Sequence, residues 1–344
     1  MPGFYIKNRL VGESHPPLVI AELGINHGGS IEIAMKLADL AIKSGAEIIK
    51  SQTHLITDEM SEEAKNVIPG NASVSIFEII QKCALSQQNE IELKKYVESR
   101  GCIYISTPFS RSAVDFLDEL NVPAFKIGSG ECNNYPLVEH IARKRKPIIL
   151  STGMNSIDSI RPSVEIFRKY KIDFALLHCT NLYPTSNHLI RLSALNQLKN
   201  EFPDAVIGLS DHSVSNASSY GAVALGASII ERHFTDSKSR SGPDIVCSMT
   251  PSELKELIDF SFQIFQSLQG DKIPLKEEEV TSAFAFSSLV AIKDISAGEI
   301  LTQDNCWVMR PSGGYPANQY FELLGKKVKV DVKTGFQIPK GSIT

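Results

Sequence analysis

The sequence predicts an α/β protein whose main part is a (β/α)8 TIM barrel, followed by a small β-rich domain. Two observations predict the barrel: eight short apolar runs end in polar residues, and amphipathic segments alternate with these runs. Such pairs over about 250 residues are typical of eight parallel strands that are each followed by a helix. A doubly wound open sheet is the alternative, but no GxGxxG motif follows the first apolar run. A third observation predicts the second domain, because the alternation stops after Gly270.

Each predicted strand starts as an apolar run and becomes polar at its carboxyl end. Runs of this kind are typical of strands that are buried on both faces of a parallel sheet. The predicted strands are 18–23, 47–52, 102–107, 124–129, 147–152, 174–180, 205–210 and 228–233.

The predicted helices lie between these strands and have one apolar face. The first two close on glycine, at Gly45 and Gly101, which is a common signal for the end of a helix. The predicted helices are 31–45, 89–101, 111–120, 135–144, 157–170, 192–202, 216–226 and 251–270.

Three parts of the chain fall outside the repeating pattern: residues 1–17, the connection 53–88, and residues 271–344. Residues 1–17 are expected to form a hairpin over one end of the core. The connection 53–88 is longer than the usual loop of a compact domain, so we expect either a lid over the binding site or an insertion with short helices of its own. We place the barrel in 1–270, a linker with a short helical stretch in 271–283, and the β-rich domain in 284–344. A domain of that size has a marginal core and is expected to pack on something else.

Composition excludes several classes of function. The chain has 35 lysines and arginines against 39 aspartates and glutamates, a net charge of −4, and no basic stripe that would favour nucleic acid. No apolar run reaches the roughly 20 residues that span a bilayer. The first fifteen residues lack the apolar core of a signal peptide, so we expect a cytoplasmic protein. The six cysteines form no CxxC pair and are expected to be buried free thiols.

Two of the predicted strands lead into histidines, at His212 and His233. If these strands are neighbours in the barrel, both imidazoles lie on one rim. Such a pair is suited to a divalent metal with room for substrate. The alternative is two rim histidines that only form hydrogen bonds.

Two lysines, Lys50 and Lys126, lie inside apolar runs. A buried ammonium requires an anion, so with the hydroxyls of neighbouring strand ends they could bind a phosphate or carboxylate. A lysine that forms a Schiff base is the competing interpretation. The strand ends place further polar residues on the same rim: Glu22, Gln52, Thr107, Ser129, Ser151, Asn181 and Ser210.

The loops above this rim contribute carboxylates. Glu131 follows the fourth strand and could act as an acid or base, or could order a water; its alternative role is to support the cap of the helix that begins near Pro136. The loop after the last strand carries Asp236 and Asp244 and suits a polyhydroxylated substrate.

At these positions the chain resembles the bacterial sialic acid synthase (N-acetylneuraminate synthase) family. The resemblance rests on AELGINHGGS, KSQTH, STPFSR, FKIGSGECNNYPL, LSTGMNS, HCTNLYPT, GLSDHS and ERHFTD…GPD, in order along the chain. The tail LVAIKDISAGEILTQDNCWVMRP resembles the antifreeze-like (SAF, β-clip) domain of that family. The resemblance implies condensation of phosphoenolpyruvate with N-acetylmannosamine, a divalent metal (Mn²⁺ or Mg²⁺), and a domain-swapped homodimer.

The resemblance also implies roles for individual residues. Glu131, beside the metal, is expected to handle the proton of the attacking water, and Arg310 to reach the sugar from the partner subunit. The chain departs from the common family pattern at Ser51 and Gly28. The matched positions are His212 and His233 for the metal; Lys50, Thr107, Lys126, Ser129, Ser151, Asn181 and Ser210 for phosphoenolpyruvate; and Glu22, Gln52, Tyr183, Asp244 and Arg310 for the sugar.

Three alternatives remain open at this point. Synthases of legionaminic and pseudaminic acids share this scaffold. A Schiff-base pyruvate aldolase or lyase would use one lysine and no metal. A sugar- or ice-binding protein without catalytic activity is the third, and two buried lysines beside two histidines argue against it.

Overall fold

The computed structural model describes residues 2–70 and 73–344. By its internal contacts the chain divides into two compact units, Met1–Gln269 and Gly270–Thr344. The expected linker and the expected β-rich domain both fall in the second unit. Each unit is described by itself below.

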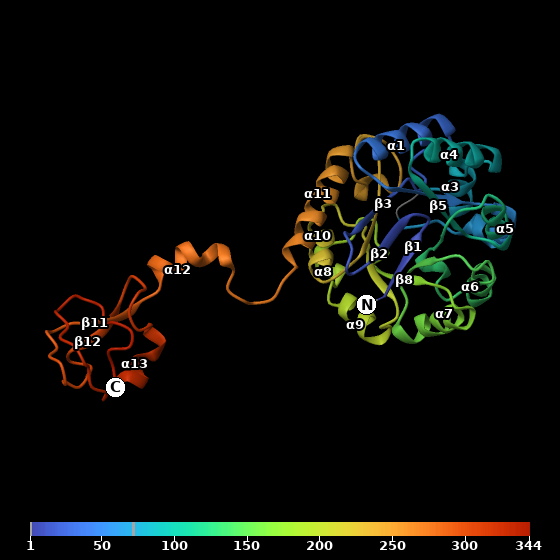
Figure 1. Ribbon diagram of the computed structural model, residues 1–344. Helices are drawn as coiled ribbons and strands as arrows, with labels where there is room; N and C mark the ends of the chain where they lie inside the picture. Colours follow the sequence, from blue (N-terminus) through green and yellow to red (C-terminus); the bar gives the residue numbers. More distant parts are fainter. Residues whose placement is uncertain (1, 71–72) are drawn as a thin grey trace. The chain divides into compact units, whose positions relative to one another are not determined.

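The first unit is a closed barrel of eight parallel strands, which confirms the predicted fold class. Figure 1 looks along the barrel and shows the helices arranged around the strands. The strands follow chain order around the barrel, and β10 closes it by pairing with β3. They are β3 (Leu18–Glu22), β4 (Ile48–Thr53), β5 (Ile103–Pro108), β6 (Phe125–Ile127), β7 (Ile148–Ser151), β8 (Phe174–Cys179), β9 (Val206–Ser210) and β10 (Ile229–His233).

The pairing of β9 with β10 brings two of the predicted site elements together. The register places Ile229 beside Gly208 and Glu231 beside Ser210. A Cβ added at Gly208 would lie only 2.4 Å from the carbonyl oxygen of Ile229, so the close approach of these strands requires glycine. The carboxyl ends of β9 and β10 are therefore neighbours on the rim, as the histidine pair requires.

The helices around the barrel also match the prediction. Serine side chains at Ser30, Ser86, Ser110 and Ser156 accept the N–H group three residues later and so begin four of these helices. The helices are α1 (Ile31–Lys43), α4 (Gln87–Ser99), α5 (Arg111–Glu119), α6 (Tyr135–Ala142), α7 (Ile157–Tyr170), α9 (Ala194–Glu201), α10 (Ala217–Ala224) and α11 (Pro251–Ser267), with short turns at η2 (Ser129–Glu131), α8 (Asn187–Ile190) and η3 (Ile245–Cys247).

The N-terminal segment forms the expected hairpin, β1 (Gly3–Ile6) and β2 (Arg9–Gly12). Its buried residues Phe4, Ile6 and Val11 pack with the inward-facing residues of the barrel strands, such as Ile20 and Ile48. The hairpin therefore closes the amino-terminal end of the barrel and leaves the opposite end for the site.

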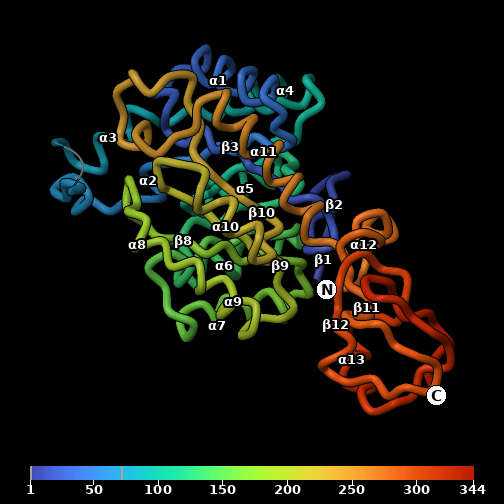
Figure 2. Tube along the Cα trace, turned by 90° about the vertical axis from the view of Figure 1, so that its left-hand side faces the viewer, coloured from blue at the N-terminus to red at the C-terminus, as the bar shows by residue number. Residues whose placement is uncertain are grey.

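The long connection between β4 and β5 contains short helices of its own, α2 (Ile56–Glu59), η1 (Glu62–Asn66) and α3 (Ile76–Cys83). Figure 2 shows the hairpin and the α2–α3 segment at opposite ends of the barrel. The insertion thus lies at the end where the carboxyl termini of the strands emerge.

The second unit has a small core of its own and short strands, as expected. Leu289, Ile295 and Tyr320 are buried in it, and Ser312 N donates to the carbonyl of Ala283, which ties α12 to the unit. Its elements are η4 (Lys276–Glu278), α12 (Glu279–Ala285), β11 (Ser288–Ala291), β12 (Cys306–Met309), η5 (Ala317–Gln319) and α13 (Tyr320–Leu323), with β11 and β12 antiparallel.

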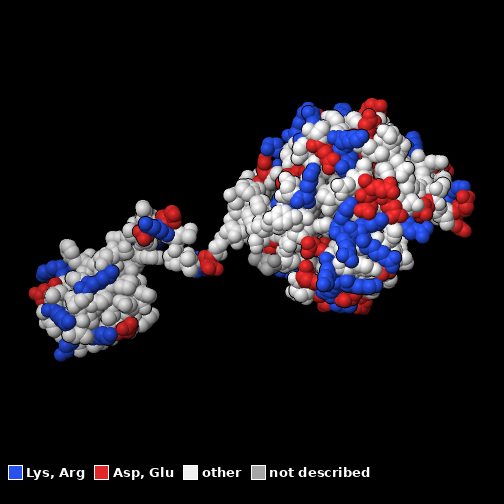
Figure 3. All heavy atoms as spheres, turned by 45° about the vertical axis from the view of Figure 1, so that its right-hand side comes forward, with Lys and Arg blue, Asp and Glu red and all other residues white. Residues whose placement is uncertain are grey.

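The surface agrees with the expectations from composition. On the face shown in Figure 3, lysine and arginine side chains are interspersed with aspartate and glutamate. Within the described residues, no helix combines the length and apolarity that a membrane crossing needs. All six cysteines are free thiols, and five of them are buried.

Candidate active site

A cavity of about 150 Å³ opens at the carboxyl ends of the barrel strands. Most of the residues predicted from the strand ends line it together, although they are spread over more than 200 positions of sequence. The predicted residues in its wall are Glu22, Lys50, Gln52, Thr107, Lys126, Ser129, Ser151, Asn181, Tyr183, Ser210, His212 and His233; Phe109, Gly128, Gly130, Cys179 and Glu231 complete it.

Lys50 forms one charged cluster in this wall. Its Nζ lies 2.6 Å from Glu22 Oε2 and donates to Thr107 Oγ1 at 3.0 Å. Gln52 Nε2 donates to the other oxygen of Glu22 at 2.8 Å. Burial raises the pKa of Glu22 to about 7, and the charge of Lys50 opposes that rise. The carboxylate and the ammonium thus hold each other in place at the floor of the cavity.

Lys126 forms a second cluster. Its Nζ donates to Ser151 Oγ at 2.7 Å and to the carbonyl of Ile127 at 2.9 Å. Burial lowers the pKa of Lys126, the nearby charge of Lys50 lowers it further, and Glu231 opposes both. Two buried ammonium groups in one small cavity favour an anionic ligand, because an anion offsets the cost of keeping both charged.

Glu231 is the functional candidate that sequence reasoning missed. Its Oε1 accepts from Ser210 Oγ at 3.1 Å and lies 3.8 Å from Lys126 Nζ. Burial acts to raise its pKa, but the charges of Lys126 and Lys50 outweigh burial and hold the pKa below its usual value. Its Oε2 is buried without a hydrogen-bond partner among the described residues. The period of two along a strand was the available signal, because it places Glu231 on the same face as His233.

The two histidines lie together, as predicted. Their ring centroids are 5.5 Å apart, and Tyr183 packs on His212 with centroids 4.1 Å apart. His212 Nδ1 lies 3.1 Å from the carbonyl of Thr180 and must donate to it, which leaves the lone pair on Nε2. His233 Nδ1 is buried and has no hydrogen-bond partner in the described part of the chain.

Burial keeps both imidazoles neutral near pH 7. It lowers the pKa of His212 to about 4 and that of His233 to about 3. Asp244 Oδ2 lies 3.7 Å from His233 Nδ1, and burial raises the pKa of Asp244 to about 6. Neutral imidazole is the form that coordinates a metal. Across residues 2–70 and 73–344, however, no group of three or more His, Cys, Asp or Glu side chains is arranged to hold an ion.

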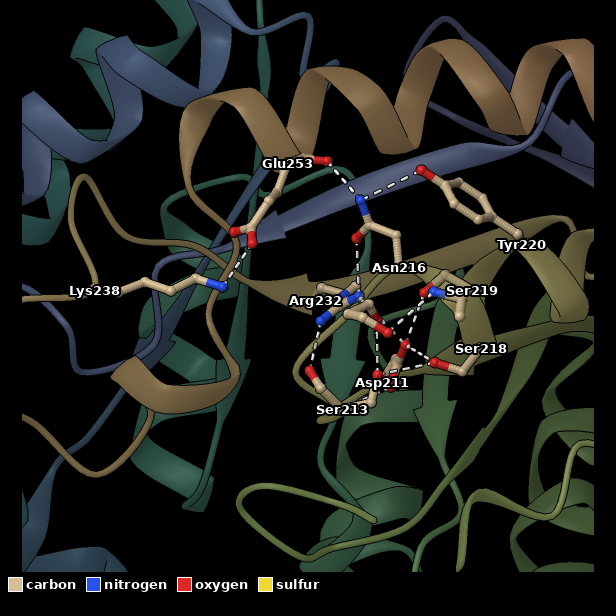
Figure 4. Close-up of polar contacts among 11 residues, drawn as sticks. Asp211, Ser213, Asn216, Ser218, Ser219, Tyr220, Arg232, Lys238 and Glu253 are labelled. Carbon is tan, nitrogen blue, oxygen red and sulfur yellow. Dashed lines mark hydrogen bonds and ion pairs between the residues drawn. The ribbon is translucent and has the colours of Figure 1, made fainter. Parts of the chain in front are cut away.

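A buried ion pair is formed by the residues that precede the two histidines in the sequence (Figure 4). Asp211 and Arg232, each the residue before one histidine, approach to 3.6 Å. Arg232 also donates to the carbonyl of Ser213 at 2.6 Å and to Asn216 Oδ1 at 2.9 Å. The carboxylate of Asp211 accepts from two serine hydroxyls of α10. This network ties the end of β10 to the loop that follows β9, and so supports both histidine positions.

Three predicted site residues do not line the cavity. Glu131 accepts from Asn134 Nδ2 at 2.5 Å, and Asn134 in turn caps α6 by accepting from Leu137 N at 3.3 Å. This placement matches the helix-cap alternative for Glu131. Asp244 lies at the edge, beside His233. Arg310 is exposed and belongs to the second unit.

The two departures from the family pattern, Ser51 and Gly28, differ in their surroundings. Ser51 in β4 is completely buried, and its hydroxyl has no hydrogen-bond partner within the described ranges. Gly28 has φ +58° and open space where a Cβ would point. Neither residue lines the cavity.

The sequence is similar to proteins of known families. The NeuB family matches residues 37–273, and the SAF domain matches residues 286–343. The chain is 38% identical over 317 residues to N,N'-diacetyllegionaminic acid synthase of Campylobacter jejuni. The aligned region covers 90% of this chain and 95% of that protein. It is 34% identical over 333 residues to N-acetylneuraminate-9-phosphate synthase of Homo sapiens. This second aligned region covers 94% of this chain and 92% of that protein.

The fold is similar to a solved structure as well. The crystal structure of an N-acetylneuraminic acid (sialic acid) synthetase from Leptospira borgpetersenii, in complex with citrate, matches with a TM-score of 0.75 and 30% sequence identity. The match covers 81% of this chain and 94% of the other.

Proposed function

The chain belongs to the NeuB family and carries a SAF domain, and from that membership we propose that it is an N-acetylneuraminate synthase. Its relatives are synthases of the sialic acid type, so the enzyme class is a phosphoenolpyruvate-dependent transferase. In the proposed reaction, phosphoenolpyruvate, N-acetylmannosamine and water give N-acetylneuraminate and phosphate. One observation carries the proposal: two buried lysines and two neutral, buried histidines line one small cavity.

The lysines are proposed to hold the phosphate and the carboxylate of phosphoenolpyruvate. Lys50 and Lys126 come from different strands, and Thr107 and Ser151 already bond to them. Charge-assisted hydrogen bonds from ammonium groups are suited to both anions. We assign Ser129, Asn181 and Ser210, which line the same cavity, to this substrate as well.

The carbonyl partner is proposed to lie on the side of Glu22 and Gln52. C3 of phosphoenolpyruvate forms a bond to the aldehyde carbon of the open-chain sugar with the electron pair of the enol double bond. The electron pair of the carbonyl double bond moves to the aldehyde oxygen, which takes up a proton and becomes a hydroxyl. Positive charge then develops at C2, where a buried carboxylate stabilises it. Tyr183 and Asp244 border the same region beside the histidines.

Glu231 is proposed to handle the water that adds at C2. Its Oε2 is buried and free of hydrogen bonds within the described residues. The water oxygen bonds to C2 and one of its protons passes to Glu231. The bond from C2 to the phosphate oxygen then breaks with its electron pair on that oxygen, the C2 hydroxyl becomes the carbonyl, and its proton leaves with the phosphate. This assignment replaces Glu131, whose carboxylate is engaged with Asn134 away from the cavity wall.

We also propose that a divalent cation, Mn²⁺ or Mg²⁺, belongs to this site. The residues fit, because His233 Nδ1 is a buried nitrogen without a partner in the described residues and the pairing of His212 with Thr180 leaves its Nε2 lone pair available. His212 and His233 would hold the ion, with Asp244 close by. When bound, such an ion polarises the aldehyde oxygen as a Lewis acid.

A homodimer completes the proposal, with Arg310 reaching the sugar in the barrel of the partner. Large apolar side chains are exposed in and next to α12, among them Val280 at 78%, Phe284 at 60% and Phe286 at 67%. Phe321 is 81% exposed. Exposed apolar surface of this extent is typical of a protein interface.

A second candidate product is N,N'-diacetyllegionaminic acid, which the 38% identity to the Campylobacter jejuni synthase favours. The test is release of phosphate from phosphoenolpyruvate, measured with N-acetylmannosamine, its 6-phosphate, and the diacetamido precursors of legionaminic and pseudaminic acids. The proposal expects the highest kcat/KM with N-acetylmannosamine. A diacetamido or phosphorylated sugar that is preferred by 10-fold or more would reassign the product within the family.

The Schiff-base alternative has its own test. Borohydride added during turnover would trap an imine as a stable mass increase on Lys50 or Lys126. We expect no such adduct, either with pyruvate or with phosphoenolpyruvate. An adduct together with activity that survives a chelator would identify a pyruvate aldolase instead.

A further inference from the structure

A chain of hydrogen bonds leads from the cavity floor out to α2 in the long insertion. Glu22 Oε1 accepts from Gln52 Nε2 at 2.8 Å, and Gln52 Oε1 lies 3.0 Å from His54 Nε2. On its other side, His54 Nδ1 lies 2.9 Å and 3.1 Å from the two carboxylate oxygens of Glu59. His54 belongs to the KSQTH motif, and the proposed mechanism gives it no role.

The imidazole of His54 is held rigidly between the two ends of this chain. Phe109, which lines the cavity, stacks on it with ring centroids 4.5 Å apart and an interplanar angle of 9°. Its side chain is only 4% exposed and that of Glu59 only 9%. The neighbour of Glu59 anchors α2, because Asp58 Oδ2 accepts from Ser112 N at the start of α5 at 2.8 Å.

The hydrogen bonds of this chain are consistent with two arrangements of its protons. An ionised Glu59 can only accept, so His54 Nδ1 must carry a proton. With the Gln52 amide in this orientation, Oε1 can also only accept, so in this arrangement His54 Nε2 carries a proton too and the ring is an imidazolium. The NH2 group of Gln52 then faces Glu22, which must accept as a carboxylate.

The second arrangement follows if the Gln52 amide is rotated by 180°. Its NH2 group would then donate to Nε2 of a neutral His54, and its oxygen would face Glu22, which would have to be the protonated donor. The two states differ in the position of one proton, on His54 or on Glu22. Glu90 from α4 and His27 from the loop after β3 also lie close enough to His54 to interact with its charge.

We propose that His54 is a positioning residue: as an imidazolium paired with Glu59, it fixes the orientation of the Gln52 amide and thereby holds Glu22 as a carboxylate toward the sugar. This inference rests on the proposed function for the assignment of Glu22 and Gln52 to the sugar side. His54 itself does not line the cavity, so its effect on substrate passes through Gln52.

The kinetic test separates the two substrates. His54→Leu removes both donors, His54→Gln restores one donor toward Gln52, and Glu59→Gln removes the charge that retains the second proton. Glu62→Gln is the matched control, because Glu62 follows in η1 and its ion pair with Lys65 at 2.6 Å is at the surface.

We expect His54→Leu to raise KM for the sugar by about 10-fold or more, the effect of a lost charge-assisted hydrogen bond, with KM for phosphoenolpyruvate unchanged. His54→Gln should recover most of the loss, Glu59→Gln should lie between them, and Glu62→Gln should match the native chain. An equal effect on both substrates, or none on either, would overturn the proposal. If His54→Leu does not fold, the comparison of His54→Gln with Glu59→Gln still decides it.

A second measurement does not depend on the reaction. In the native protein labelled with ¹⁵N-histidine, we expect His54 to show two protonated ring nitrogens near pH 7, and Glu59→Gln to convert it to a neutral ring. A neutral His54 in the native protein would overturn the inference. If no amino sugar supports phosphate release, the proposed function fails while this spectrum still tests the proton arrangement.

Discussion

At the scale of single residues, His233 stands apart because its Nδ1 is fully buried and has no hydrogen-bond partner among the described residues. By contrast, His178 Nε2 lies 2.6 Å from the carbonyl of Ile190, and both nitrogens of His54 are paired. A buried nitrogen without a partner costs free energy unless a ligand binds there. That cost is the physical reason to connect His233 with an ion or a substrate.

Replacing either rim histidine should therefore abolish turnover while the fold is retained. We expect His212→Ala and His233→Ala to lower kcat by more than about 100-fold, because even outer partners of a metal ligand typically account for 10–100-fold. Phosphate release and binding of Mn²⁺ by calorimetry are the measurements, with circular dichroism to check the fold. His188→Ala, at an exposed histidine of α8, is the control. Full activity of His212→Ala after chelator treatment would contradict the metal proposal.

Glu231→Gln tests the carboxylate that was not expected from the sequence. The amide keeps the size of the side chain and its contact with Ser210 but cannot take a proton from water. A loss of kcat of about 100-fold or more is expected, since general acid–base groups contribute at least that much. The same change at Glu131 should cost less than 10-fold. A larger loss at Glu131 than at Glu231 would favour the original assignment of Glu131.

Another buried carboxylate, Glu90, lies outside the cavity and is expected to affect stability rather than chemistry. Its Oε1 accepts from Thr53 Oγ1 at 2.6 Å and from the hydroxyl of Tyr104 at 2.9 Å. Burial raises the pKa of Glu90, and these donors only partly oppose the rise. The folded protein therefore holds this proton to a higher pH than the unfolded chain does.

The sign of the resulting pH dependence follows from linkage. Between the unfolded pKa, about 4.5, and the higher folded pKa, the folded state binds more protons, so rising pH lowers the free energy of unfolding. Glu90→Gln keeps both accepted hydrogen bonds but does not titrate. From pH 4.5 to pH 8 its stability should improve relative to the native chain by about 1.4 kcal/mol per unit of pKa shift.

Urea denaturation at both pH values measures this difference. Glu92→Gln, at an exposed position of the same helix, is the control and should leave the pH dependence unchanged. A Glu90→Gln protein with the native pH dependence would show that the pKa of Glu90 is not raised.

At the scale of elements, the Asp211–Arg232 pair connects the end of β9 with α10 and β10 (Figure 4). Both side chains are nearly completely buried, so each depends on the other for compensation of its charge. The backbone carbonyls that Arg232 binds belong to the loop just after His212. The histidine positions are therefore supported by contacts between elements and not by their own strands alone.

Breaking this pair from one side should be costly. Asp211→Asn or Arg232→Met alone is expected to lower the free energy of unfolding by about 3–5 kcal/mol, because each leaves an uncompensated buried charge or donor. The double variant should lose clearly less than the sum of the two. Chemical denaturation of the three variants gives the coupling energy. Additive losses would show that the two side chains act independently.

At the scale of the whole molecule, the second unit has a core but exposes many large apolar side chains. Its role in the proposed homodimer is inferred from the family resemblance. Arg310 is the residue through which this question can be tested, because it is exposed on that unit.

Hybrid dimers provide the test. Arg310→Ala should raise KM for the sugar far more than KM for phosphoenolpyruvate. Mixing Arg310→Ala subunits with His212→Ala subunits should restore activity, since one of the two sites in each heterodimer then has an intact barrel and an intact Arg310. Lys329→Ala, at another exposed cation of the unit, should behave as the native chain. Absence of rescue in verified heterodimers would mean that the unit serves its own barrel.

The sequence alone determined the barrel and most of the rim. Apolar runs that turn polar at their ends mark parallel strands, and such strands must all point their carboxyl ends to one mouth. This is why Lys50, Lys126, His212 and His233 could be brought together before any contact was known. The same reasoning gave the residues at the strand ends without a resemblance, and the resemblance then supplied Tyr183, Arg310 and the substrates.

Only the tertiary structure decided which carboxylates serve the cavity. Glu131 and Glu231 are both near strand ends. The carboxylate of Glu131 bonds to Asn134 at the cap of α6, whereas that of Glu231 lies 3.8 Å from Lys126 in the cavity wall. The pairing of His54 with Glu59 likewise depends on how α2 is anchored to α5. A local pattern defines the period of a strand, whereas the side chains that meet in a cavity wall, such as Glu231 and Lys126, are brought together by the packing of elements distant in sequence. That difference is the physical reason why the scaffold could be predicted and the partners of these carboxylates could not.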